Sequence, residues 1–115
     1  MSFWRKQVID YALDHETRMQ MEEQRAWIAR EPANAQPYYH LAQLYRVAYQ
    51  QDEALGLLLE AIRLDGSFAA AHCALAEVYV MRDDQPAAWR HARLAAEHGD
   101  SRALELLTRY SASNK

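Results

Sequence analysis

The sequence is poor in residues that interrupt helices or that mark secreted and membrane proteins. Three glycines and three prolines among 115 residues are too few for a β-rich or disordered chain. No apolar run approaches the roughly 18 residues that a membrane span needs, and charges interrupt the opening MSFWRKQVIDYALD too early for a secretory signal. The single cysteine, Cys73, cannot form an internal disulfide. We therefore expect a cytoplasmic protein without membrane contact.

The chain also lacks an excess of basic residues. Its formal net charge is -3, and acidic and basic side chains are mixed in the first 30 residues. Binding to nucleic acid requires a concentrated basic face. The sequence therefore predicts no nucleic-acid partner.

What the chain does contain is a 34-residue period and an abundance of helix-forming residues such as Ala, Leu, Glu and Arg. Identical residues lie one period apart at Leu41 and Leu75, Ala42 and Ala76, Tyr45 and Tyr79, Ala54 and Ala88, and Ala61 and Ala95. A period of this length indicates supersecondary units that stack on one another.

The period divides the chain into blocks over 1–34, 35–68 and 69–102. Each block is predicted to hold two antiparallel helices, followed by a capping helix over 102–111 and a frayed tail at 112–115. We therefore expect one all-α domain over 1–115, a right-handed α-solenoid of about seven helices.

In the second block, Asn34 is predicted to cap a helix that ends at the turn 49–52. A second helix follows over 52–64. Gly66 is predicted to end it in the left-handed conformation, and Ser67 to cap the next helix.

The third block repeats this plan, with a helix over 68–81 and a second one that begins near Pro86. Gly99 is predicted to stop the second helix, and Ser101 to cap the last. The first block follows the pattern less well, because Trp27 replaces a small residue. We still expect two helices there, over about 2–15 and 17–30.

The repeated alanines are predicted to let paired helices approach to about 8 Å. Tyr45 and Tyr79 are predicted to fill the wedge between successive pairs. A single pair leaves an apolar face uncovered, so the pairs must stack.

The second and third blocks resemble the tetratricopeptide repeat (TPR). The motif residues are Tyr38, Leu41, Ala42, Tyr45, Ala54, Leu58 and Ala61 in one copy, and His72, Leu75, Ala76, Tyr79, Ala88, Ala92 and Ala95 in the next. His72 and Ala92 depart from the motif. The resemblance covers about 68 residues firmly, and it implies a solenoid whose concave groove binds peptides or partner proteins.

The resemblance also implies which side chains face the groove. Those positions hold Arg5, Ile9, Ala12, Tyr39, His40, Gln43, Arg46, Cys73, Glu77 and Val80. Members that bind C-terminal carboxylates place Lys, Asn and Arg at positions that here hold Arg5, Ile9, His40, Ala70 and Ala74. Only Arg5 suits that role, so a carboxylate clamp is not expected. The alternative for the groove positions is an ordinary solvated surface.

A second surface is predicted at Leu57 and Leu59, which fall outside the buried stripe of their helix, and at the N-terminal Phe3 and Trp4. Partner docking, homodimer packing and chance exposure remain open for it. No histidine spacing or glycine-rich loop predicts a metal, cofactor or catalytic site. The sequence thus predicts a non-catalytic scaffold or adaptor that binds a protein or peptide in its groove, with self-association as the alternative.

Overall fold

The computed structural model describes the backbone of residues 2–113 and the side chains of residues 14–112. Within that range every regular element is a helix, and no strand occurs. The helices are α1 (Ser2–Arg30), α2 (Ala35–Val47), α3 (Gln51–Leu64), α4 (Ala69–Met81), α5 (Gln85–Glu97) and α6 (Arg102–Ser113). The predicted all-α, TPR-like solenoid is confirmed, with six described helices in place of about seven.

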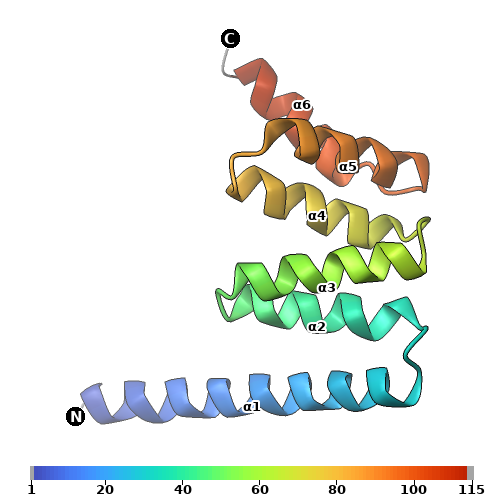
Figure 1. Cartoon of the computed structure of the whole chain (residues 1–115). Coiled ribbons are helices and arrows are strands. Elements are labelled where there is room, and N and C mark those ends of the chain that lie inside the picture. Colours follow the sequence, from blue (N-terminus) through green and yellow to red (C-terminus); the bar gives the residue numbers. More distant parts are fainter. Residues whose placement is uncertain (1, 114–115) are drawn as a thin grey trace.

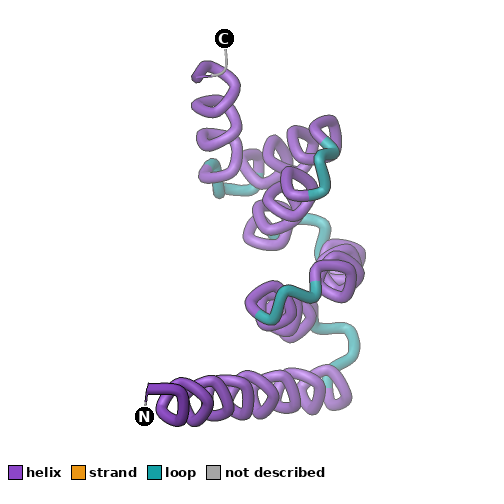
Figure 2. The backbone as a smooth tube through the Cα atoms, turned by 90° about the vertical axis from the view of Figure 1, so that its left-hand side faces the viewer, coloured by secondary structure: helices purple, strands orange, loops and turns teal. Residues whose placement is uncertain are grey.

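The helices stack as two antiparallel pairs, α2 with α3 and α4 with α5, flanked by α1 and α6 (Figure 1). α3 packs on α4 and joins the pairs, α1 packs on α2, and α6 packs on α5. The stack is curved, and both chain ends lie on the same side of it (Figure 2). The first helix of each pair lies on the hollow side of this curve, together with α6.

The predicted division of the first block into two helices is wrong, because α1 is one continuous helix of 29 residues. No glycine or proline occurs between Ser2 and Arg30, so nothing in the backbone forces a turn. At 1.5 Å per residue α1 is about 43 Å long, against about 20 Å for α2. Its N-terminal half therefore runs past α2 (Figure 1). No described helix, α1 included, combines the length and hydropathy needed to cross a membrane.

The repeated alanines form the contacts inside each pair, as predicted. Ala42, Ala54 and Ala61 are fully buried in one pair, and Ala76, Ala88 and Ala95 are at most 1% exposed in the other. They belong to two core clusters, one centred on Leu58 and Leu75 and one that extends to Leu107 on α6. Tyr79 packs against both clusters, and Tyr45 packs against the first.

The turn inside each pair closes on a residue in the left-handed region, one period apart in the sequence. Tyr49 has φ 61° and Asp83 has φ 59°. The amide after each one bonds back to a tyrosine carbonyl, from Gln50 to Tyr45 at 2.8 Å and from Asp84 to Tyr79 at 2.9 Å. Both turns thus use the same helix-ending geometry.

The helix ends between successive pairs agree only in part with those predicted from the sequence. Asn34 caps α2 by accepting a hydrogen bond from the Gln36 amide, and Gly99 adopts φ 101° after α5, as predicted. The predictions for Gly66 and Ser67 are wrong. α3 ends at Asp65 in extended conformation, and the Asp65 carboxylate accepts bonds from the Ser67 amide and hydroxyl. That local turn replaces both a left-handed glycine and a serine cap.

Candidate interaction surface

Side chains of α2 and α4, two helices on the hollow side of the stack, form a connected polar network, which we call the inner face. Its members are Tyr39, Gln43 and Arg46 on α2 and Glu77 on α4. Gln43 Nε2 donates to the Tyr39 hydroxyl at 3.4 Å, and Arg46 Nη1 donates to Gln43 Oε1 at 3.1 Å. Arg46 Nη2 then reaches Glu77 Oε2 at 2.8 Å. The structure therefore brings together four of the residues predicted for the groove.

The Arg46–Glu77 ion pair joins the two helix pairs across the inner face. The Arg46 side chain is 19% exposed and that of Glu77 is 44% exposed. Arg46 Nε is buried and makes no hydrogen bond with any described residue. An acidic ligand at this point would have to compete with Glu77 for the guanidinium, so Arg46 is not a free cation site.

Cys73, which the sequence placed among the groove positions, lies buried on α4. Burial raises the pKa of its thiol, and the nearby Asp100 carboxylate adds to the effect. A raised pKa keeps the sulfur as the weakly reactive thiol. The residue is therefore poorly suited to act as a thiolate nucleophile.

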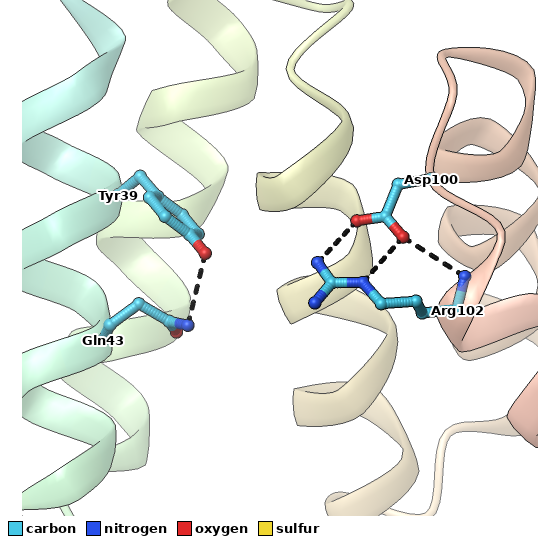
Figure 3. A network of polar contacts seen from close by, with 4 residues as sticks. All are labelled: Tyr39, Gln43, Asp100 and Arg102. Carbon is cyan, nitrogen blue, oxygen red and sulfur yellow. Dashed lines mark hydrogen bonds and ion pairs between the residues drawn. The ribbon is translucent and has the colours of Figure 1, made fainter.

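Asp100 and Arg102 extend this surface to the start of α6, and sequence reasoning missed both. The Asp100 carboxylate accepts bonds from Arg102 Nε and Nη2 at 2.9 and 2.7 Å. It also accepts one from the Arg102 amide at 3.2 Å (Figure 3). The hydrogen bonds from Arg102 lower the pKa of Asp100, with a smaller contribution from Cys73. The sequence feature that could have indicated these two residues is the loop after Gly99, where an acidic residue precedes the start of a helix.

Aromatic rings lie next to the inner face, near the N-terminal end of α2. The Tyr39 ring lies 5.1 Å from the Phe68 ring and 5.4 Å from His40. His40, which is exposed, stacks on Trp27 of α1 at 6.3 Å. The predicted groove residue His40 therefore lies beside Trp27, which the repeat pattern treated only as a departure.

Several predicted positions lie outside the described side chains. These are Arg5, Ile9 and Ala12 of the groove and Phe3 and Trp4 of the second surface. The two leucines of the second surface separate. Leu57 is partly buried and packs against the first core cluster, so its predicted orientation away from the core is wrong. Leu59 is 39% exposed.

Two histidines meet inside the α4–α5 pair. His72 and His91 are 3% and 5% exposed, and their Nδ1 atoms are 3.1 Å apart. Burial, with the charges of His72 and Arg90, lowers the pKa of His91 to about 4. Among the described residues, no group of three or more His, Cys, Asp or Glu side chains gathers in a metal-binding arrangement. The pair therefore forms a buried contact between α4 and α5.

The sequence matches no protein-family model, and comparison with curated proteins gives no match. Solved structures do resemble the fold. "Crystal structure of MamA" has a TM-score of 0.68 at 20% identity, covering 77% of this chain and 52% of that one. "MamA 41-end from Desulfovibrio magneticus RS-1" has a TM-score of 0.67 at 24% identity, covering 86% of this chain and 55% of that one.

A third structure, "MamA RS-1 ArsTM double mutant", has a TM-score of 0.67 at 24% identity and covers 83% of this chain and 53% of that one. At these identities the likeness concerns the fold alone. The present chain spans about half the length of each of these proteins. The comparisons thus support a TPR-like repeat fold and leave the activity to be argued from the surface.

Proposed function

We propose that this chain is a TPR-type, non-catalytic scaffold that binds a peptide or a segment of a partner protein on its inner face. The observation that carries the proposal is the network from Tyr39 through Gln43 and Arg46 to Glu77, which connects two repeat units on the hollow side. A curved stack whose polar inner-face side chains are already ordered is suited to binding a partner without a catalytic step.

The chemistry of the inner face supports a polypeptide as the ligand. Its cations are paired within the protein, Arg46 with Glu77 and Arg102 with Asp100. A surface of paired charges and amides offers both donors and acceptors, as a peptide backbone requires. The Tyr39 ring, which is partly buried, would supply the apolar anchor. A cytoplasmic location and the absence of a nucleic-acid partner belong to the same proposal.

The test compares peptide capture by wild-type protein with capture by Tyr39→Ala and Arg46→Glu variants. We expect each variant to lose affinity by roughly tenfold or more, because one removes an aromatic anchor and the other breaks the Arg46–Glu77 pair. Arg18→Glu is the matched control, since Arg18 is exposed on α1 and pairs there with Asp14. Unchanged binding by both inner-face variants would contradict the proposal.

Self-association is the second candidate, because Leu59 presents an exposed leucine on α3. Sedimentation equilibrium of wild-type and Leu59→Asp protein decides it. A dimer that Leu59→Asp converts to a monomer would favour this candidate. A wild-type monomer at high concentration would eliminate it.

A further inference from the structure

Exposed apolar side chains gather at one place beside the inner-face network, with Glu77 common to both. Eight large hydrophobic residues are exposed among the described residues, and four of them line a single cleft between α4 and α6. They are Val80 at 38%, Met81 at 66%, Leu106 at 59% and Tyr110 at 61%. Scattered apolar residues are ordinary on a protein surface, whereas a cluster of this kind marks a contact site.

The cleft exists because α6 diverges from the pair before it. α6 packs chiefly on α5 and touches α4 less, and it rises steeply from that pair (Figure 2). Buried Ala76 and Ala103 line its inner part, together with Leu107. Its volume is about 420 Å³, within the roughly 300–1,000 Å³ of ligand pockets.

The charges that line the cleft have one sign. Glu77 and Asp83 contribute carboxylates, and no lysine or arginine is among its lining residues. Asp83 is exposed in the turn after α4, and Glu77 shares one oxygen with Arg46 of the inner face. A ligand with a cation next to its apolar part would complement this rim.

We propose that the α4–α6 cleft binds the apolar side of a helical partner segment that carries lysine or arginine at its margin. The cleft lies between two helices, and Leu106 and Tyr110 form a ridge of i and i+4 residues on α6. A helix placed there would insert its own i, i+3 and i+4 side chains beside that ridge. The inference rests on the proposed scaffold function and names the chemistry of the partner.

The experiment selects short random peptides of about 12 residues against the intact protein, with counter-selection against the Leu106→Asp variant. Enriched peptides should combine apolar residues at helical spacing with flanking lysine or arginine. Their synthetic versions should lose affinity by more than about tenfold with Leu106→Asp or Met81→Asp. They should lose about two- to fivefold with Asp83→Asn.

Met19→Asp is the matched control, because it introduces the same charge at an exposed position on α1 away from the cleft, and it should leave peptide affinity unchanged. Circular dichroism checks that every variant folds. Enriched peptides that bind Leu106→Asp as well as wild type, or that carry acidic flanks, would overturn the inference.

Two other results would also overturn it and are distinguishable. Peptides sensitive to Tyr39→Ala and Arg46→Glu but not to Leu106→Asp would leave the scaffold function standing without the cleft. A wild-type dimer that Leu106→Asp makes monomeric would show that a second copy, and not a basic helical segment, occupies the cleft. Peptide binding that none of these substitutions weakens would contradict both proposals.

Discussion

At the scale of single residues, the geometry of the His72–His91 contact places one proton on His72 Nε2. His72 Nε2 lies 2.8 Å from the Gly66 carbonyl oxygen, which only accepts, so Nε2 carries the proton. The Nδ1 atoms of the two rings are 3.1 Å apart, so one of them donates the proton that the other accepts. The Tyr79 ring stacks on His91 at 5.5 Å and helps to exclude water.

The free energy of unfolding should therefore fall as the pH falls from about 6.5 toward 4. The pKa of His91 is lowered from 6.5 to about 4, so between these values the unfolded chain binds a proton that the folded chain excludes. The loss attributable to His91 is roughly 3 kcal/mol at pH 4 relative to pH 7. Urea denaturation across this pH range measures it.

A His91→Gln variant should show a shallower pH dependence, because Gln can donate to His72 but does not titrate. His40→Gln, at an exposed position, is the control and should keep the wild-type slope. An unchanged slope in His91→Gln would show that other groups carry the acid sensitivity.

At the scale of helices, residue size decides how closely neighbours pack and backbone chemistry decides where a helix ends. Fully buried alanines such as Ala88 and Ala92 form the α4–α5 contact. They leave no space there for a larger side chain. In α1, the absence of any helix breaker extends the helix through a point where the period had suggested a turn. Packing thus follows the repeat, whereas the length of α1 follows local sequence.

Enlarging a contact alanine should destabilise the protein. Ala88→Leu adds three carbon atoms where α5 meets α4, which forces the helices apart and should cost about 1–3 kcal/mol. Ala26→Leu is the matched control, because Ala26 is exposed on α1, and it should change stability by less than about 0.5 kcal/mol. Chemical denaturation followed by circular dichroism compares the two. Equal stabilities would mean that the α4–α5 contact is loose.

At the scale of the whole molecule, each helix contacts mainly its neighbours along the stack. α4 is the most enclosed element, with α3, α5 and α6 against it and buried residues along most of its length. α6 is covered only by the preceding pair. In such an array stability is carried by neighbouring contacts, so it should vary along the chain.

Hydrogen exchange should detect this gradient under native conditions. We expect amides in α4 to exchange at least about tenfold more slowly than those in α6, because α6 can open without breaking the α4–α5 contact. Mass spectrometry of peptides from the two helices measures the difference. Equal protection would show that the chain opens as one cooperative unit.

The sequence anticipated most of the inner face but not its extension. The resemblance to the tetratricopeptide repeat implied that Tyr39, Gln43 and Arg46 face the groove, and positions three and four apart do share one side of a helix. It did not place Asp100 and Arg102, since their position depends on the path of a loop. The α4–α6 cleft was not predicted for a similar reason, because no single residue of α6 determines the angle at which that helix leaves α5.

By itself the sequence determined the helical class, the paired units and the alanine contacts, because these depend on local propensity and on residues spaced within one or two turns. Only the tertiary structure decided that Arg46 pairs with Glu77, that Leu57 joins the core, and that α6 opens a cleft beside α4. Those features depend on the distance and angle between helices. Side chains from several segments together determine this distance and this angle, so neither can be inferred from a pattern along one segment.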